Sequence, residues 1–468
     1  MVESRSTHST PDSGAQGIAR RLGLGAPVTR RRALTGAAAI AGAGFLSACG
    51  TKGSGGGSSS TGTSSAGGSQ KPVGGNSVSF GSNYSDPAPK QAFASLISAA
   101  EKNTGVKVSI NSVDHNTFQN NINSYLQGTP NDLFTWFAGY RLQTFASKGL
   151  ITQIDDVWDK IGSGFPDAIK ALSKGADGHY YLVPIYNYPW VVFQNMTVFN
   201  KHGYEVPKNW DALITLCKKI KGDGLIPFAF GQKDGWPALG TFDILNLRIN
   251  GYDFHMQLCQ HKVPWTDSRL TAVFDHWREL MPYCQTGATG RIWQDAAKTL
   301  ETGKAAMMFQ GTNQVAAQYV ADKADLKALD FFVYPEINAQ WGQDYMDAPA
   351  DGFCISAKAK NVTASKKLLE YIGTGEAEAS YLKYDQWDVA VASGATVPSY
   401  NAIQKKSVEV IGKCKSVAQF LDRDSDGGFA DNTVAAAFDQ FINNPTAGEA
   451  QSIMKSLEAQ AKTVFKTS

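Results

Sequence analysis

The chain has no marked excess of charge of either sign. Its 44 lysines and arginines nearly balance its 42 aspartates and glutamates, which leaves a formal net charge of +2 at pH 7. After residue 50 the basic residues form no stripe that could follow a phosphate backbone, so we expect no nucleic-acid partner. The same region has no apolar run long enough to span a bilayer. These absences count against a nucleic-acid-binding protein and against a membrane-spanning segment after residue 50.

Cysteine is also scarce, with six residues in the chain. Five of them follow Cys49: Cys217, Cys259, Cys284, Cys354 and Cys414. No two of these are spaced as CxxC, which excludes the usual zinc and thioredoxin-like motifs. In an oxidising compartment we expect one disulfide, between Cys259 and Cys284, because these two are close in sequence. Most of the others are expected to be small buried apolar residues.

Motifs of common catalytic sites are missing. Gly303-Lys304 lacks the preceding glycine of a phosphate-binding loop, and GxSxG, HExxH and a clear GxGxxG are absent. Asp155 and Asp156 are adjacent carboxylates, but their place before a predicted helix is explained by capping. The seven histidines are scattered, so we expect no metal and no cofactor. A glycosidase stays open, because its two carboxylates need no local motif.

One segment has the pattern of a metal loop. Asp422–Gly427 fits the first half of a calcium loop, D-x-D-x-D-G, but its twelfth position is Thr433 where a bidentate glutamate is required. Aspartate-rich turns beside glycine are also ordinary surface turns. A third interpretation is that Arg423 and Asp424 face a cleft and form hydrogen bonds with sugar hydroxyls. The sequence leaves these three alternatives open.

The first 49 residues have the features of an export signal. Paired arginines within Thr29–Leu34 precede a weakly apolar run, as in twin-arginine export signals. As a helix, the run from Ala33 to Leu46 would extend only about 21 Å, too short to span a bilayer. Leu46-Ser-Ala-Cys49 resembles the lipobox of bacterial lipoproteins, which implies a lipid anchor at Cys49. Residues 50–75 are nearly all Gly, Ser and Thr, which indicates a flexible tether.

The remaining ~400 residues are too many for one hydrophobic core and predict two domains. Strands are expected over 77–81, 106–110 and 132–137, and helices over 89–103 and 116–127. This alternation indicates βαβ units and a parallel sheet. In open sheets of this kind, ligands bind beyond the carboxyl ends of the strands. Three pairs of residues are therefore expected at one edge of the sheet: Asn83 and Tyr84, His115 and Asn116, and Trp136 and Phe137.

A second α/β region follows a crossover over 180–193. It has predicted helices over 209–221, 239–249, 268–284 and 293–302, and predicted strands over 226–230, 304–310 and 329–334. Residues 352–356 are expected to re-enter the first sheet, and the chain from Ser399 onward is expected to be helical. We therefore assign 76–187 and about 345–395 to lobe 1. Lobe 2 is assigned 188–344 and about 396–468.

Aromatic residues are frequent near predicted turns. They include Trp136, Tyr140, Tyr186, Tyr188, Trp190, Trp236, Trp265, Trp293, Trp341 and Trp387. For most of them, packing in the core is a sufficient explanation. A sugar site nevertheless needs such residues, because one face of a pyranose ring carries C–H bonds that stack on an aromatic ring.

Several separated segments resemble, in the same order, the extracellular solute-binding proteins of ABC importers, in the carbohydrate group that includes maltose-binding protein. The segments are the strand-loop-helix opening, Pro130–Trp136, Gly149–Asp155, His179–Pro184, Val206–Asp211, Leu300–Met307 and Gly352–Ala357. The resemblance implies an α/β fold of two lobes, each a central sheet flanked by helices. It also implies a ligand in the cleft, closure by a hinge and no catalytic residues.

The resemblance also implies site residues and partners. Trp136 and Trp236 match aromatic residues that stack on sugar, Tyr186 lies at the crossover, and the loop 83–86 matches a polar stretch that contacts hydroxyls. The expected partners are a carbohydrate and the membrane subunits of an ABC permease. The protein is then a monomer, anchored by lipid to the outer face of the cytoplasmic membrane.

One departure from the family bears on the size of the ligand. The family's Gly-x-Trp is here Gly311-Thr312-Asn313, which lacks the aromatic and favours a mono- or disaccharide over a long chain. Position at strand ends adds His115, Asp351 and Gln310 as candidate site residues. The competing hypotheses are a secreted carbohydrate-active enzyme and a clamp for a polyamine, a peptide or an anion.

Overall fold

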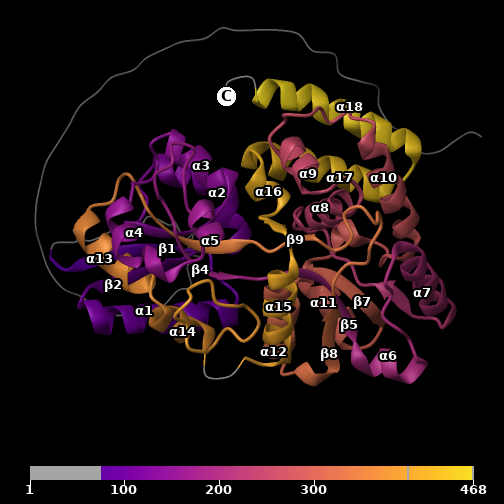
Figure 1. Cartoon of the computed structure of the whole chain (residues 1–468), viewed down its shortest axis with the longest axis horizontal. Coiled ribbons are helices and arrows are strands. Elements are labelled where there is room, and N and C mark those ends of the chain that lie inside the picture. Colours follow the sequence, from indigo (N-terminus) through magenta and orange to yellow (C-terminus); the bar gives the residue numbers. More distant parts are fainter. Residues whose placement is uncertain (1–74, 398–399, 466–468) are drawn as a thin grey trace, which may run out of the picture. The chain divides into compact units, whose positions relative to one another are not determined.

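The computed structural model describes residues 75–397 and 400–465. The predicted export signal, the lipid-attachment residue Cys49 and the tether up to residue 74 lie outside the described residues and stay predictions. Two sheets with surrounding helices make up most of the described chain (Figure 1).

Sheet 1 is built from both early and late parts of the chain. Its strand order is β2 (Lys107–Ser112), β1 (Ser77–Ser82), β3 (Leu133–Phe137), β10 (Ala350–Ile355) and β4 (Val183–Asn187). Strand β1 runs parallel to β2 and β3, which confirms the predicted βαβ units. Strand β10 is antiparallel to β3 and β4, so the segment predicted to re-enter the first sheet does so.

Sheet 2 has the order β6 (Ile226–Phe228), β7 (Ala305–Gly311), β5 (Trp190–Asn195) and β8 (Leu329–Phe332). Strand β5 is antiparallel to β7 and β8, and β6 is parallel to β7. A small third sheet pairs β9 (Tyr345–Asp347) with β11 (Ser416–Ala418). The chain passes from sheet 1 to sheet 2 between β4 and β5, within the predicted crossover.

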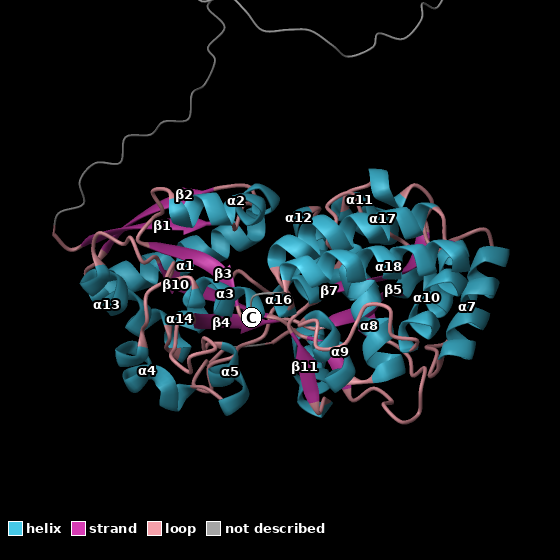
Figure 2. Ribbon diagram, turned by 90° about the horizontal axis from the view of Figure 1, so that it is seen from above, coloured by secondary structure: helices cyan, strands magenta, loops and turns pink. Residues whose placement is uncertain are grey.

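Helices lie along the strands of sheet 1 (Figure 2). They are α1 (Pro87–Thr104), α2 (His115–Gln127), α3 (Tyr140–Ser147), α4 (Asp155–Ile161), α5 (Asp167–Leu172), α13 (Val362–Ile372) and α14 (Gly375–Leu382). Helix α1 has proline at its first position and ends at Gly105, whose φ of 70° suits glycine. Helix α13 contacts α1 and α4, which brings chain from opposite halves of the sequence together in Figure 1.

The remaining helices lie between the strands of sheet 2 in the chain or follow its last strand. They are α6 (Met196–His202), α7 (Trp210–Gly222), α8 (Pro237–Asn250), α9 (Tyr252–Cys259), α10 (Arg269–Leu280), α11 (Trp293–Glu301), α12 (Thr312–Ala321), α15 (Ala402–Lys413), α16 (Leu421–Asp424), α17 (Ala435–Asn443) and α18 (Ala447–Val464). Short helical turns occupy Gly162–Gly164, Met281–Tyr283, Ala288–Gly290, Leu326–Ala328 and Phe429–Val434. No helix in the described ranges is both long and apolar enough to cross a membrane.

The central strands are buried along their whole length. Every residue of β3, β4, β5 and β10 is buried, which suits strands covered by helices on both faces. The described residues belong to one compact unit, so the lobe boundaries given above stay predictions.

Candidate functional site

A cavity of about 130 Å³ lies where loops from both sheets meet. It is lined by Asn83, Tyr84, Ser85, Asp86, Pro89, Asp114, His115, Asn116, Gln119, Tyr186, Tyr188, Trp190, Trp236, Trp293, Gln294, Asn313, Gln314, Asp351, Tyr381, Asp385, Trp387, Asp388, Phe420, Asp422 and Arg423. Several of these residues follow strand ends or begin helices, among them Asn83 after β1 and His115 at the start of α2. The cavity therefore lies where an open α/β sheet is expected to bind its ligand.

Seven of the ten predicted site residues line this cavity. They are Asn83, Tyr84, His115, Tyr186, Trp236, Asp351 and Arg423. Their contact with a ligand stays a prediction. The other three, Trp136, Gln310 and Asp424, are buried elsewhere and are not on the cavity wall.

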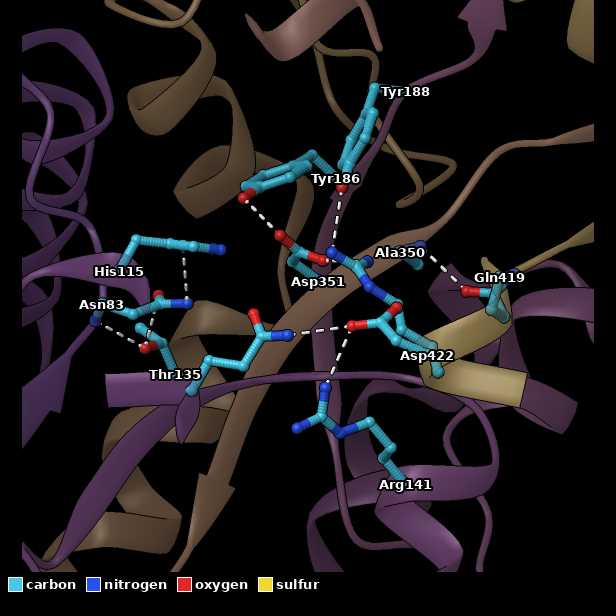
Figure 3. A network of polar contacts seen from close by, with 12 residues as sticks. Asn83, His115, Thr135, Arg141, Tyr186, Tyr188, Ala350, Asp351, Gln419 and Asp422 are labelled. Carbon is cyan, nitrogen blue, oxygen red and sulfur yellow. Dashed lines mark hydrogen bonds and ion pairs between the residues drawn. The ribbon is translucent and has the colours of Figure 1, made fainter. Parts of the chain in front are cut away.

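An ion pair forms one side of the cavity. Phe137, Asp351 and Tyr186 are neighbours across strands β3, β10 and β4, and a shift of register follows Asp351. Arg423 Nη1 lies 2.6 Å from Asp351 Oδ1, and Arg423 Nη2 donates to the hydroxyl of Tyr188 at 3.0 Å (Figure 3). Burial opposes the charge of Arg423, but the Asp351 carboxylate raises the pKa of Arg423 above its ordinary value. The guanidinium is therefore held in place and stays charged.

A second polar group lies on the loop after β1. The backbone N–H of Asn83 donates to Thr135 Oγ1 at 3.0 Å, and the Thr135 hydroxyl donates back to Asn83 Oδ1 at 2.8 Å. The Asn83 amide nitrogen is then left to contact His115 Nδ1 at 3.3 Å (Figure 3). Burial lowers the pKa of His115, so its ring is neutral and can accept this hydrogen bond. The orientation of Asn83 is thus fixed before any ligand binds.

Asp422 joins three chain segments at another edge of the cavity. Its Oδ2 accepts hydrogen bonds from Gln119 of α2 and from Arg141 of α3, both at 3.0 Å (Figure 3). Arg141 also pairs with Asp431 at 3.1 Å. Gln119 and Asp422 lie 303 residues apart in the chain, so no local sequence pattern predicts that they share this wall.

Aromatic rings cover the side of the cavity nearest sheet 2. Trp190 packs against Trp236 at 6.0 Å between ring centroids and against Phe420 at 4.7 Å. Phe420 has a φ of 108°, which non-glycine residues rarely adopt and which is typical of functional sites. Trp293 lies 6.5 Å from Trp236. Trp190, Trp293 and Trp387 also line the cavity. Their place near predicted turns was the only sequence signal for them, and of these four tryptophans only Trp236 was predicted to bind the ligand.

Six lining residues carry buried polar atoms without a hydrogen-bond partner among the described residues. The atoms are Asn313 Oδ1, Gln314 Oε1, the Tyr381 hydroxyl, Trp387 Nε1, Asp388 Oδ1 and Asp422 Oδ1. Buried polar groups are rarely left unpaired, so such a concentration around one cavity calls for a partner. Asn313 and Gln314 make this wall of the cavity polar.

The placement of Trp136 corrects its predicted role. Side chains alternate across a strand, and in β3 it is Thr135 and Phe137 that contact Asn83 and Arg423 of the cavity wall. Trp136 points to the opposite face, is 1% exposed, and packs against Phe145 at 5.2 Å. Trp136 is therefore a core residue, whereas Thr135 and Phe137 lie behind the cavity and support Asn83 and Arg423 of its wall.

Gln310 and Asp424 are also corrected. Gln310 lies inside β7 and is buried, while the cavity is reached three residues later at Asn313. Asp424 turns away from the cavity and accepts the backbone N–H of Gln419 at 2.7 Å. Burial raises the pKa of Asp424 to about 7.

The aspartates of the calcium-like loop are directed to separate partners. Asp422 pairs with Arg141, Asp424 accepts from Gln419, and Asp426 Oδ1 caps the N–H of Phe429 at 2.9 Å. Over the ranges that the structure describes, no three histidine, cysteine or acidic side chains are grouped to hold a metal ion. The capping and pairing contacts account for this aspartate pattern.

The predicted disulfide is absent. The five described cysteines are free thiols. Cys259 Sγ lies 3.6 Å from His255 Nε2, whereas the Cys284 thiol donates to the carbonyl of Leu280 at 3.7 Å. Closeness in sequence did not bring these two cysteines together, because each packs against its own helix.

Comparison with known proteins identifies the family. The profile of the bacterial extracellular solute-binding protein family matches residues 84–379. An uncharacterised ABC transporter extracellular-binding protein of Pyrococcus horikoshii is 26% identical over 295 residues, 62% of this chain and 65% of that protein. A probable sugar-binding periplasmic protein of Rhizobium meliloti is 29% identical over 184 residues, 37% of this chain and 42% of that protein. The chain thus spans less than two thirds of the length of these two relatives.

Solved structures agree with the fold. The bacterial solute receptor AcbH, described as having an exclusive substrate preference for β-D-galactopyranose, is 63% identical with a TM-score of 0.82. The match covers 84% of this chain and 100% of AcbH. A chitin oligosaccharide binding protein has a TM-score of 0.73 at 19% identity, covering 83% and 99% of the two chains, and shows the fold alone. The chain belongs to the bacterial extracellular solute-binding proteins, a family of receptors and not of enzymes, and it has their two-lobed α/β fold.

Proposed function

We propose that this protein is the sugar-binding component of an ABC importer and that it captures a single neutral hexopyranose, with β-D-galactopyranose as the first candidate. The observation that carries the proposal is the cavity itself. It combines aromatic rings on one side with a held arginine, a held asparagine and unpartnered polar atoms around the rim. Its walls thus offer ring-stacking surfaces together with donors and acceptors for hydroxyl groups.

The size of the cavity supports one sugar ring. A volume of about 130 Å³ holds roughly ten water-sized groups, since each needs about 10–15 Å³. That is close to the size of one hexose and leaves no room for a chain of them. The likeness to AcbH, whose described preference is for β-D-galactopyranose, supports the same size and class of ligand.

Closure of the two lobes over the sugar is part of this proposal. Lobe 1 comprises residues 76–187 and about 345–395, and lobe 2 comprises the rest of the described chain. Asn116, at the start of α2, donates to Asp234 Oδ1 at 3.1 Å, and Asp234 follows strand β6. This hydrogen bond joins the two assigned lobes beside the cavity and supports a closed state.

Calorimetry of the full-length chain tests the ligand. Galactose, glucose, mannose, lactose and raffinose form the panel, with putrescine, glutamate and calcium as non-sugar controls. We expect galactose to bind and the trisaccharide not to bind. Binding of putrescine alone would contradict the proposal that the ligand is a sugar. Tight binding of raffinose would contradict the proposal that the cavity holds a single sugar ring.

We further propose that the protein is exported by the twin-arginine route, lipidated at Cys49 and held at the outer face of the cytoplasmic membrane. There it would deliver its sugar, as a monomer, to a permease. The sequence around Cys49 supports this, and the family to which the chain belongs is extracellular. Cys49→Ser should move the protein from the membrane to the soluble fraction. A variant that stays with the membrane fraction would contradict the anchor.

A further inference from the structure

Two aspartates on the cavity wall form a close pair. Asp385 and Asp388 follow helix α14, both line the cavity and both are 1% exposed. Asp385 Oδ1 accepts the backbone N–H of Asp388 at 3.1 Å, which closes a tight turn. The charge of Asp385 opposes ionisation of the neighbouring Asp388 carboxyl group. Two buried carboxyl groups this close tend to keep one proton between them.

The pair has no basic partner. The other buried carboxylates of the wall are neutralised, Asp351 by Arg423 and Asp422 by Arg141. Within the described ranges, neither Asp385 nor Asp388 has a lysine, arginine or histidine within ion-pair distance, and Asp388 Oδ1 has no hydrogen-bond partner. Arg423 is the one lysine or arginine among the described lining residues, and its charge is already matched. An anion entering the cavity would find no free cation.

Protonation of the pair leaves one negative charge on it. Burial raises the pKa of Asp385 to about 6, and it raises the pKa of Asp388 further, with the neighbouring Asp385 charge adding to the effect. Two adjacent buried carboxyls do not both ionise near neutral pH. The backbone N–H that Asp385 accepts favours its ionised form, so Asp385 is the member that carries the negative charge and Asp388 the member that keeps the proton.

We infer that the Asp385–Asp388 pair sets the charge selectivity of the cavity: it admits uncharged hexopyranoses and rejects those that bear a carboxylate or a phosphate. The inference rests on the proposed sugar function. A buried negative charge without a counter-ion repels an incoming anion, which has also lost its water. An uncharged sugar instead meets an acceptor carboxylate beside a protonated carboxyl group.

Three ligands of one shape test the charge effect without any mutation. Calorimetry at pH 7 compares galactose, galacturonate and galacturonamide, whose amide replaces the carboxylate at nearly the same size. We expect the full-length protein to bind galactose and galacturonamide, and to bind galacturonate at least tenfold more weakly than galacturonamide. Equal rejection of galacturonate and galacturonamide would overturn the inference, because the barrier would then be one of size.

Two matched variants assign the effect to this pair. Asp385→Asn removes the charged member, and we expect at least a tenfold rise in the ratio of galacturonate to galactose affinity. Asp388→Asn leaves the charge on Asp385 and should keep galacturonate out. Asp167→Asn, at an exposed side chain of α5, controls for the change in net charge. A merely structural role would weaken both sugars together and leave the ratio unchanged, which overturns the inference.

The outcomes separate this inference from the proposed function. A wild-type protein that binds neither galactose nor another neutral sugar contradicts the proposed function and, with it, the inference. Wild-type binding of both galactose and galacturonate with similar affinity contradicts the inference alone. If Asp385→Asn does not fold, the galacturonamide comparison still decides the question on the wild-type chain.

Discussion

The guanidinium of Arg423 and the carboxylate of Asp351 meet at 2.6 Å, although 72 residues separate them in the chain. Asp351 lies on β10, the strand between β3 and β4 in sheet 1, and Arg423 is carried by the short helix α16. Phe137 lies under the guanidinium, 4.0 Å from its carbon to the ring centroid. The pair thus fixes α16 to sheet 1 and presents a charged donor to the cavity.

Arg423→Lys should weaken sugar binding by about 1–3 kcal/mol, because lysine keeps the charge but loses the planar set of donors. Calorimetry with galactose measures the change. Arg278→Lys, at an exposed ion pair of α10, is the matched control and should bind as wild type does. Equal affinities for Arg423→Lys and the control would remove Arg423 from the binding site.

Trp136 and Trp236 should respond to substitution in opposite ways. Trp136 is a core residue, so Trp136→Phe should lower the free energy of unfolding by about 1–3 kcal/mol and leave sugar affinity within twofold. Trp236 is half-buried on the cavity wall, so Trp236→Ala should weaken binding by about 1–3 kcal/mol with a smaller effect on stability. Urea unfolding and calorimetry on both variants test this. Loss of affinity in Trp136→Phe at unchanged stability would reverse the assignment.

Sequence patterns predicted the early elements of the fold well. The apolar alternation and the glycine and proline positions predicted β1, α1, β2, α2 and β3 to within a few residues. These signals are local, because periodicity and turn chemistry act over a few residues. The loop after β1 was therefore also placed correctly, and with it Asn83 and Tyr84 of the cavity wall.

Local patterns of this kind could not predict contacts between segments that are distant in the chain. The burial of Trp136 depends on the packing of β3, whose residues are all buried, and its sequence neighbourhood did not show this. Gln119 and Asp422 meet only because α2 and α16 pack together in the folded chain. The role of Asp385 and Asp388 depends on the missing counter-ion, which no local pattern reveals.

Gly427 allows Arg141 to reach its two aspartates. A Cβ atom at Gly427 would lie 2.6 Å from Arg141 Nε, so Gly427→Ala must displace the guanidinium from Asp422 and Asp431. Breaking a buried pair leaves charge uncompensated, and we expect a loss of about 2–4 kcal/mol in unfolding free energy. Differential scanning calorimetry or urea unfolding measures it.

Gly412 provides the matched control for this substitution. It lies within α15, and a Cβ there meets nothing within 4 Å, so Gly412→Ala should be neutral or stabilise by up to about 1 kcal/mol. If Gly427→Ala is as stable as Gly412→Ala, the contacts of Arg141 with Asp422 and Asp431 do not stabilise the folded protein.

The free thiols can be counted directly. Alkylation of the unfolded chain without reductant, followed by mass spectrometry of its peptides, should label Cys217, Cys259, Cys284, Cys354 and Cys414. In the native protein the same reagent should act slowly, because burial raises the pKa of Cys284 to about 12 and that of Cys414 to about 11. A peptide pair linked through Cys259 and Cys284 would restore the sequence-based prediction of a disulfide.

Glu378 makes stability depend on pH. It is buried in α14, where its two carboxyl oxygens accept the backbone N–H groups of Val391 at 2.7 Å and Ala392 at 2.8 Å. Burial raises the pKa of Glu378 from 4.5 to about 8, and these two hydrogen bonds only partly oppose the shift. Between those pH values the folded state binds a proton that the unfolded state has lost. The contribution to stability is therefore complete below about pH 4.5 and is lost as the pH rises through 8.

Glu378→Gln removes this titration, because glutamine stays neutral throughout. The wild-type free energy of unfolding should fall relative to the variant by up to about 1.4 kcal/mol per pH unit between pH 5 and pH 8. At pH 5 the variant should be the less stable protein, since its amide nitrogen faces one of the two N–H groups. Urea unfolding at pH 5, 6.5 and 8 measures the slopes, with Glu376→Gln, exposed on the same helix, as the control. Parallel curves for wild type and Glu378→Gln would show that Glu378 is ionised in the folded protein, in which case its two backbone donors outweigh the effect of burial.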